Sequence, residues 1–575
     1  MSPMPTDKYR AFQAVPLPDR RWPTRTLERA PQWCSVDLRD GNQALVEPMG
    51  VERKRRMFLL LVRLGFKEIE VGFPSASQPD FDFVRQLVSE DLIPDDVTIQ
   101  VLTQAREELI ERTFAALVGV RRAIVHVYNS TSSLQRRVVF GLDEDGVVAV
   151  ATEAVRRIKA LASASPATEI VLQYSPESFT GTELPFARRI VEAVIGEWGP
   201  APDRKMIVNL PATVEMSTPN VYADQIEWFD RNCTRRDSFV LSVHPHNDRG
   251  TAVAAAELAL LAGAERIEGT LFGNGERTGN VDIVTLALNL FSQGVVPGLD
   301  LSDVPKIVQT VEHCNRMPVH ARHPYGGELV FTAFSGSHQD AIKKGLAARE
   351  ARGEVLWEVP YLPIDPADLG RDYEPVVRIN SQSGKGGVAY VLESDYGYIL
   401  PKALQIDFSK AVQTLSEQSG GEVTSAEIAT MFEGEYLMDA PLQLLEAHAA
   451  DDGAGRITLE ATIADRSGLR TLRGAGNGPI DALVAALRSE LVVQLHVRDY
   501  HEHAIGSGED AAAVAYVEAT VAGRKHFGAG RDRNITKASL LAVLAAVNRA
   551  VIHDNLRCSG LPAMERMEAR APVAL

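Results

Sequence analysis

Two histidines and an aspartate are the residues whose types and spacing point most directly to chemistry. His244 and His246 close residues 239–246, which have the composition of a buried strand. Because residues i and i+2 of a strand point to the same face, the two imidazoles are expected to lie side by side. Pro245 between them has no backbone N–H to donate, which places the pair where the sheet ends. With one carboxylate, such a pair makes an N/O site for a divalent metal with open positions.

The segment Arg39-Asp40-Gly41-Asn42-Gln43 carries the candidate carboxylate, Asp40. Arg39 beside it has the charge to stabilise the alkoxide that forms when a carbon nucleophile adds to a ketone. Each assignment has a plain structural alternative. The two histidines could cap a strand and hydrogen-bond to loops, and Arg39 could simply pair with a neighbouring carboxylate. Asn280 is a further candidate ligand through its amide oxygen.

Eight short β-rich runs alternate with amphipathic stretches between Trp33 and Ser292. The runs are residues 33–38, 68–73, 97–103, 123–129, 169–175, 206–211, 239–244 and 266–272. Helical patterns lie between them, among them residues 51–64, 82–89, 106–117 and 251–261. Eight such repeats over roughly 250 residues are typical of a TIM (β/α)8 barrel. A doubly wound sheet is the alternative, but the first strand–helix junction lacks the dinucleotide pattern G-x-G-x-x-G.

Polar residues gather where the predicted strands end. They are Arg39, Asp40, His126, Asn129, Gln173, Ser175, Glu177, Asn209, Thr213, His244, His246 and the glycine-rich segment 273–280. Because the active sites of TIM barrels lie at the C-terminal ends of the strands, the sequence predicts that these residues share one rim. A divalent ion held there could chelate a 2-oxo acid through its carboxylate and ketone oxygens and polarise the ketone.

Composition narrows the class of protein. A chain of 575 residues should hold more than one domain, and its net charge of -16 argues against general nucleic-acid binding. Every apolar stretch is interrupted by charges or glycines, so we expect no membrane span. The first 30 residues are rich in proline and arginine and do not resemble a secretory signal. Four cysteines without paired spacing indicate a reducing, cytoplasmic location.

The C-terminal part contains an internal repeat. Leu459-Glu-Ala-Thr-Ile-Ala464 recurs as Val517-Glu-Ala-Thr-Val-Ala522, and Gly474-Ala-Gly476 recurs as Gly528-Ala-Gly530. Each copy then enters a helical stretch, residues 480–491 and 534–551. The pattern predicts a strand–strand–glycine-turn–helix unit used twice about a pseudo-two-fold axis, since coincidence would not preserve the order. Helix N-termini after glycine loops are suited to bind the carboxylate of a small amino acid.

Three motifs together resemble the 2-isopropylmalate synthase family. They are Asp37-Leu-Arg-Asp-Gly-Asn-Gln43, His244-Pro-His-Asn-Asp248 and Gly273-Asn-Gly-Glu-Arg-Thr-Gly-Asn280. The run Asn380-Ser-Gln-Ser-Gly-Lys-Gly-Gly387 is similar to the longer bacterial and fungal class of the family. The resemblance extends over about residues 30–555. It implies a condensation of acetyl-CoA with 3-methyl-2-oxobutanoate, followed by thioester hydrolysis, as the first committed step of leucine biosynthesis.

The resemblance also implies roles for individual residues. The metal ligands would be Asp40, His244, His246 and Asn280; the catalytic residues Arg39, Glu177, His338 and Tyr373; the substrate-binding residues His126 and Thr213. His338 is the candidate base or proton relay, with a solvated helix residue as the alternative. The metal would be Mg²⁺, with Mn²⁺ or Zn²⁺ as alternatives, and a monovalent cation such as K⁺ is a further candidate.

The expected organisation follows the same resemblance. Residues 1–30 would be an N-terminal extension, 31–325 the catalytic barrel, 326–440 mostly helical linker subdomains, 441–555 an α+β regulatory domain and 556–575 a tail. Leucine would be the effector and a homodimer the assembly. Homocitrate or citramalate synthase, and an acyl-CoA lyase or aldolase on the same barrel, are the enzymatic alternatives. A ligand-sensing protein with a disabled barrel is the non-enzymatic alternative, against which the intact Arg39, Asp40 and histidine pair argue.

Overall fold

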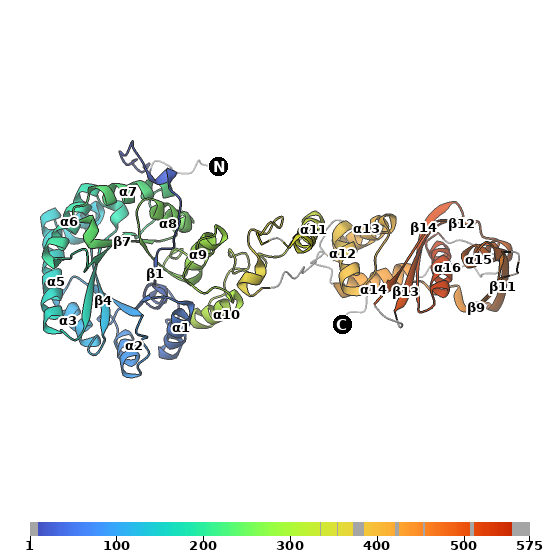
Figure 1. Ribbon diagram of the computed structural model, residues 1–575, viewed down its shortest axis with the longest axis horizontal. Helices are drawn as coiled ribbons and strands as arrows, with labels where there is room; N and C mark the ends of the chain where they lie inside the picture. Colours follow the sequence, from blue (N-terminus) through green and yellow to red (C-terminus); the bar gives the residue numbers. More distant parts are fainter. Residues whose placement is uncertain are drawn as a thin grey trace. The chain divides into compact units, whose positions relative to one another are not determined.

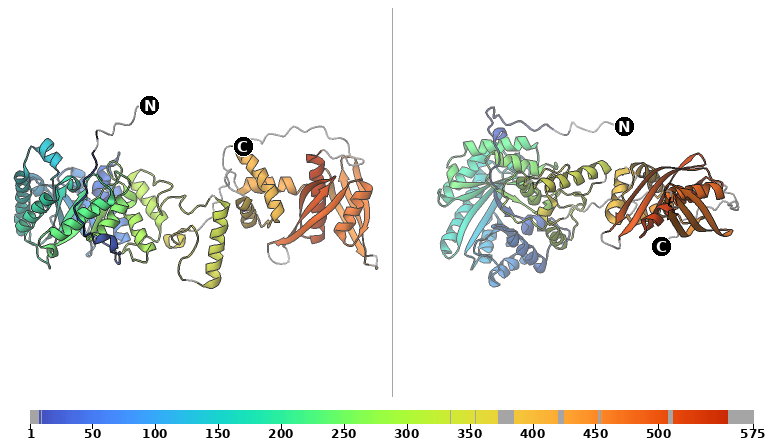
Figure 2. Two further views of the ribbon diagram at one scale, coloured as in Figure 1. Left: turned by 90° about the horizontal axis from the view of Figure 1, so that it is seen from above. Right: turned by 45° about the vertical axis from the view of Figure 1, so that its right-hand side comes forward.

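Two structural units divide the chain. The structure, a computed structural model, describes residues 8, 10–333, 335–353, 355–371, 385–419, 425–451, 453, 455–506 and 511–554. The barrel unit contains Met1–Phe331 and Ile364–Tyr373, and the C-terminal unit contains Thr332–Pro363 and Glu374–Leu575. Figures 1 and 2 show each unit with its own arrangement of strands and helices.

A closed barrel of eight parallel strands forms the first unit, so the predicted TIM barrel is confirmed. Each strand pairs with the next, and β8 pairs with β1. The strands are β1 Gln32–Ser35, β2 Glu68–Gly72, β3 Thr98–Gln104, β4 Arg122–Ser130, β5 Glu169–Glu177, β6 Met206–Ala212, β7 Phe239–Pro245 and β8 Arg266–Gly269. The strands are buried on both faces, which fits this architecture, because the outside of a parallel barrel must be covered by helices.

The helices surround the barrel, as Figure 1 shows. They are α1 Val51–Leu64, α2 Gln78–Ser89, α3 Glu107–Ala116, α4 Ser133–Gln135, α5 Glu144–Ala164, α6 Leu184–Trp198, α7 Pro219–Asn232, α8 Ala252–Leu261, α9 Ile283–Ser292 and α10 Val304–Asn315. Local signals set their ends. The Ser77 side chain caps α2 by accepting from the backbone N–H of Asp80, and α1 stops at Gly65, whose φ of 100° suits glycine.

The first and last strands end earlier than predicted. The expected runs 33–38 and 266–272 are strands only over Gln32–Ser35 and Arg266–Gly269. The Asp37 carboxylate accepts hydrogen bonds from the backbone N–H of Leu271 at 3.1 and 3.2 Å. This contact ties the two loops together beyond the ladder, and Asp37–Gly41 turns as a π-helical segment that carries Arg39 and Asp40 to the rim.

The C-terminal unit begins with helices and continues with two similar sheets. Its helices before the sheets are α11 Gly336–Arg352, α12 Lys385–Tyr396, α13 Lys402–Ser419 and α14 Ser425–Tyr436. One sheet is β9 Gln443–Asp451, β10 Ile457–Asp465 and β11 Gly468–Gly476, followed by α15 Pro479–Glu490; the other is β12 Leu495–Ile505, β13 Ala512–Val521 and β14 Arg524–Asp532, followed by α16 Ile535–His553. Both sheets are antiparallel, and α15 and α16 lie between them (Figure 1). Each repeat therefore has three strands, one more than predicted.

The repeated glycines do not form turns, contrary to the prediction. Gly474 and Gly476 lie inside β11, and Gly528 and Gly530 lie inside β14. A Cβ atom on Gly528 would lie 2.2 Å from the carbonyl oxygen of Ala542 in α16. The glycines therefore let each helix pack directly on the backbone of its strand, which is a close approach that only glycine allows.

Replacing Gly528 with alanine should destabilise the C-terminal unit by about 1–3 kcal/mol or more, because the clash is with helix backbone. The unfolding temperature of the full chain measures the effect. Gly434→Ala is the matched control, since a Cβ at this position in α14 meets nothing within 4 Å. That change should leave the protein as stable or raise its stability by about 0.5–1 kcal/mol. Equal effects of the two substitutions would contradict the packing role of Gly528.

Helix α16 is the one described helix that is long and apolar enough to cross a membrane, judged by length and composition. In its most apolar window, 67% of the helix is buried inside the structure. Val543, Leu544 and Val547 belong to the core that this helix shares with the two sheets. Its apolar character is therefore explained by its position as a core helix.

Candidate active site

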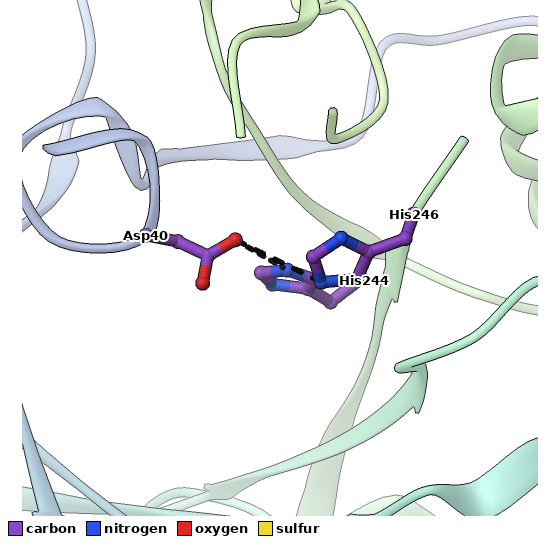
Figure 3. Close-up of side chains that lie close together, drawn as sticks. All are labelled: Asp40, His244 and His246. Carbon is purple, nitrogen blue, oxygen red and sulfur yellow. Dashed lines mark ion pairs between the residues drawn. The ribbon is translucent and has the colours of Figure 1, made fainter. Parts of the chain in front are cut away.

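Asp40, His244 and His246 converge at the C-terminal end of the barrel (Figure 3). One ligand atom from each lies within 4.8 Å of the others. The Oδ2 atom of Asp40 is 3.6 Å from Nε2 of His244 and 3.7 Å from Nε2 of His246. The strand alternation expected from the sequence accounts for the histidine pair, whose ring centroids are 5.1 Å apart. Facing atoms at these separations leave room for one ion between them.

The donor atoms of this cluster fit a divalent metal ion. All three side chains are buried, yet Oδ2 of Asp40 has no hydrogen-bond partner among the described residues. Oδ1 of Asn280 is likewise buried and unpartnered, while its Nδ2 donates to the carbonyl of Asn274 at 3.0 Å. Buried oxygens without partners are costly, and a cation would satisfy both. A mixed set of imidazole and oxygen donors suits several divalent ions.

Burial and charge give the two histidines opposite pKa shifts. Burial lowers the pKa of His244, but the hydrogen bond to Glu268 and the negative charges of Asp40 and Glu268 outweigh burial and raise the pKa to about 9. Burial and the neighbouring charge of His244 lower the pKa of His246 to about 4. Burial also acts to raise the pKa of Asp40, but Arg39 and His244 hold it well below its usual range. The cluster is therefore a strongly polarised pocket with an ionised carboxylate at its centre.

Arg39 bridges two buried carboxylates. Its Nη1 donates to Oδ1 of Asp40 at 2.6 Å, and its Nε donates to Oε2 of Glu70. Burial lowers the pKa of Arg39, but the charges of Glu70 and Asp40 outweigh it and raise the pKa above its usual value. The guanidinium is thus fixed in place and permanently charged beside Asp40 and the two histidines. The ion pairing named as the structural alternative is therefore present, and Arg39 also lines the cavity, so the pairing does not exclude a catalytic role.

Two glutamates beneath the cavity were not predicted from the sequence as part of the site. Glu268 accepts from Nδ1 of His244 at 2.9 Å, and Glu70 accepts from Nδ1 of His126 at 2.8 Å. Gln100 donates to both carboxylates at 2.9 Å, and Arg266 donates to Glu268 at 2.9 Å. The sequence did contain a signal for these roles, namely charged residues within a buried strand, as in Arg266-Ile-Glu268. These carboxylates orient the rings that face the cavity.

A cavity of about 180 Å³ opens above this layer. Its lining includes the predicted residues Arg39, Asp40, His126, Ser175, Glu177, Asn209, Thr213, His244 and His246, and also Tyr128, which was not predicted. Glu177 accepts a short hydrogen bond from the Ser130 hydroxyl, and Oγ1 of Thr213 accepts from the backbone N–H of Ser178 at 2.9 Å.

Some predicted rim residues have other positions. Asn129 is absent from the lining; it accepts from the Tyr174 hydroxyl at 2.8 Å and donates to the carbonyl of Val147. Its place in β4, an odd number of residues from His126, turns it to the opposite face. Arg277 pairs mainly with Asp248, at 2.6 Å, and only loosely with its neighbour Glu276, at 3.9 Å.

Two further candidates, His338 and Tyr373, come from the sequence beyond the predicted barrel. His338 lies in the C-terminal unit on α11, where its ring stacks on Tyr361 with centroids 4.0 Å apart. The observed α11, Gly336–Arg352, agrees with the helical stretch expected around it. Tyr373 lies outside the described residues.

The barrel and its ligand cluster define a class of enzyme. Residues 30–311 match the HMGL-like family model, whose members are TIM-barrel enzymes dependent on a divalent metal. Residues 328–393 match the model described as alpha-isopropylmalate synthase, post-catalytic domain-like, and residues 422–551 match the LeuA allosteric (dimerisation) domain.

Relatives with the same organisation identify the family within that class. A 2-isopropylmalate synthase from a Parafrankia species is 60% identical over 96% of this chain and 98% of its own length. Those from Kineococcus radiotolerans and Rhodospirillum rubrum are each 59% identical, over 96% and 95% of this chain and 99% and 98% of their own lengths. The chain belongs to the 2-isopropylmalate synthase family and is an acyltransferase of leucine biosynthesis, acting on small molecules and carrying an allosteric dimerisation domain.

Proposed function

We propose that the rim cavity condenses acetyl-CoA with 3-methyl-2-oxobutanoate and hydrolyses the resulting thioester, giving 2-isopropylmalate and CoA. The observation that carries this proposal is the buried cluster of Asp40, His244 and His246, with an unpartnered carboxylate oxygen, directly beside a fixed guanidinium. The acceptor ketone needs a Lewis acid and a positive charge near its oxygen. The cluster is suited to hold a metal ion that would act as the Lewis acid, and Arg39 is suited to supply the charge.

The bound metal and the residues around it have separate proposed roles. A bound divalent metal, for which Mg²⁺ is our first choice and Mn²⁺ or Zn²⁺ are alternatives, would supply Lewis acidity at Asp40, His244, His246 and Asn280. Arg39 stabilises the negative charge that develops on the ketone oxygen. Glu177 and Thr213 line the cavity and would contact the oxo acid or the water of the metal site. A monovalent cation such as K⁺ is part of the proposal as an additional activating ion.

The regulatory assignment rests on the C-terminal unit. We propose that leucine binds within the domain that contains residues 422–551 and inhibits the barrel, and that the enzyme acts as a homodimer. The division into a barrel at 31–325, linker subdomains at 326–440 and a regulatory domain at 441–555 is supported by the three family matches. Residues 1–30 and 556–575 are then terminal extensions.

Thiol release from acetyl-CoA tests the reaction. With Mg²⁺ or Mn²⁺ present, we expect rapid release with 3-methyl-2-oxobutanoate, slow release with pyruvate and 2-oxoglutarate, and suppression by leucine. A preference for pyruvate or 2-oxoglutarate would keep the chemistry but assign citramalate or homocitrate synthesis. No release from folded, metal-loaded protein with any oxo acid would refute the proposed reaction.

His338 is our proposed general base or proton relay for the methyl group of acetyl-CoA, with Tyr373 assisting. Replacing His338 with glutamine should lower kcat by about 10²–10⁴-fold, as expected for the loss of a general base, with little change in the KM of the oxo acid. His448→Gln, on the exposed β9, is the control and should leave kcat unchanged. If the His338 variant keeps normal kcat, this histidine is only a helix residue.

A further inference from the structure

The loop after β8 contains an arginine in a backbone conformation that usually belongs to glycine. Arg277 has a φ of 57°, in the left-handed region, although Gly273, Gly275 and Gly279 lie in the same loop. A residue with a Cβ atom is strained in this region, and glycine would relieve the strain. Such strain persists where surrounding contacts hold it, and it is concentrated at functional sites. The reason for an arginine here therefore lies in the contacts of its side chain.

The Arg277 side chain joins the three loops that follow β6, β7 and β8. Its Nε donates to Oδ1 of Asp248 at 2.6 Å, and its Nη2 donates to the carbonyl oxygen of Thr213 at 2.6 Å. Oδ2 of Asp248 accepts in turn from the backbone N–H of Glu215 at 2.9 Å. The pair of Arg277 and Asp248 thus holds the loop after β6 at two points, one on each side of Val214.

The loop after β6 depends on these contacts because its own apolar side chains are poorly buried. Val214 and Met216 are 44% and 47% exposed. A third contact comes from Thr180, whose hydroxyl donates to the carbonyl oxygen of Val214 at 3.0 Å. Two of these three contacts belong to the pair of Arg277 and Asp248, so loss of the pair should free this segment to move.

Stability alone does not account for an arginine at this position. The Arg277 and Asp248 side chains are 40% and 18% exposed, and a partly exposed ion pair contributes little to the free energy of unfolding. The strained backbone offsets that contribution. The pair therefore fixes the geometry of the rim with little net gain in stability.

Thr213 connects these contacts to the cavity that it lines. Its Oγ1 accepts from the backbone N–H of Ser178 at 2.9 Å, and its hydroxyl hydrogen has no acceptor among the described residues. That hydrogen is available to an anionic or carbonyl oxygen of a ligand. Since Arg277 holds the carbonyl oxygen of the same residue, Thr213 is fixed at both its backbone and its side chain.

We propose that Arg277 is a positioning residue that holds Thr213 in place for the 2-oxo acid, and that its strained backbone is retained for this purpose. Arg277 acts through Thr213 and Asp248 and not by contact with the substrate. This role rests on the proposed condensation, in which Thr213 contacts the oxo acid. The metal cluster is held separately, since the backbone N–H of Asn247 donates to the carbonyl oxygen of Gly279, next to Asn280, at 2.9 Å.

Arg277→Gly tests this role because it relieves the strained backbone and removes the side-chain contacts together. We expect the dissociation constant of 3-methyl-2-oxobutanoate, measured by calorimetry on the Mg²⁺-loaded full chain, to rise about 10–100-fold. A hydrogen bond to a charged group such as a carboxylate is worth about this factor in affinity.

Arg235→Gly is the matched control. Arg235 has a φ of 56° in the loop before β7, at the opposite end of the barrel from the cavity. This variant should bind the oxo acid as the wild type does, and its unfolding temperature should match that of Arg277→Gly. If Arg277→Gly binds the oxo acid normally, or unfolds at a far lower temperature than the control, the positioning role is overturned.

Asp248→Asn breaks the same contacts from the other side. An amide has one acceptor oxygen, so it cannot replace the two oxygens that serve Arg277 and Glu215. The dissociation constant of the oxo acid should rise as it does in Arg277→Gly, and the double variant should show no further rise, because both changes free one segment. Effects that multiply in the double variant would overturn the shared role of the pair.

Mn²⁺ affinity is a readout that separates Thr213 from the metal cluster. Calorimetric titration should give the wild-type affinity in all of these variants, and an equal loss of Mn²⁺ affinity would overturn the proposal by showing that the loop with Asn280 had moved instead. A wild type that binds the oxo acid but releases no CoA would refute the proposed reaction, while the binding constants would still decide the role of Arg277.

Discussion

Replacing His244 with alanine is expected to abolish turnover and to weaken metal binding, with kcat falling by about 10³-fold or more. The substitution removes one of three ligand atoms that lie within 4.8 Å of one another. It also removes one of the hydrogen-bond partners of the buried Glu268 carboxylate. Lewis-acid stabilisation contributes several kcal/mol at a developing oxyanion, and each 1.36 kcal/mol corresponds to a factor of ten in rate.

Calorimetric titration with Mn²⁺ and thiol release from acetyl-CoA measure the two effects of His244→Ala separately. Metal should raise the unfolding temperature of the wild type much more than that of the variant, because a ligand stabilises only the state that binds it. His313→Ala, at an exposed position in α10, is the control and should match the wild type in all three measurements. A His244 variant that binds Mn²⁺ normally and turns over at the wild-type rate would show that the metal assignment is wrong.

Sequence patterns were sufficient for the barrel because its signals are local and repeated. Helix α1 begins and ends where the amphipathic pattern of residues 51–64 placed it. The histidine pair follows from strand alternation and a proline, both of which depend only on neighbours in the chain. The convergence of Asp40 with the pair required only the order of strands in a TIM barrel.

Contacts between distant segments could not be predicted in the same way. Glu70 and Glu268 come from different strands, and their roles depend on Gln100, which joins them across the barrel interior. Glycines in the C-terminal repeat look like turn residues when the helix that packs on them is unknown. Strand ends at β1 and β8 depend on the contact between Asp37 and Leu271, which are 234 residues apart. In each case a long-range contact decided the structure that local propensity had left open.

Replacing Arg39 with leucine should damage both stability and catalysis. The leucine side chain leaves the buried carboxylates of Glu70 and Asp40 without the guanidinium that pairs with both. Breaking a buried ion pair on one side costs about 3–5 kcal/mol, because the remaining charge is uncompensated. Loss of the positive group beside the ketone oxygen should lower kcat by about 10²–10³-fold in the fraction that folds.

The measurement is the unfolding temperature of the full chain together with single-turnover thiol release. Arg316→Leu is the matched control, because Arg316 pairs with Glu47 at the surface, where the side chains are 59% and 56% exposed. An exposed pair contributes about 0–1 kcal/mol, so this control should change neither quantity much.

Arg39→Lys separates the two roles. The ammonium restores a charge near Asp40 and recovers part of the stability, but it lacks the fork that contacts Asp40 and Glu70 together, so kcat should stay low. Full recovery of kcat by lysine would show that a positive charge alone is enough, and that the two-carboxylate bridge has no part in catalysis.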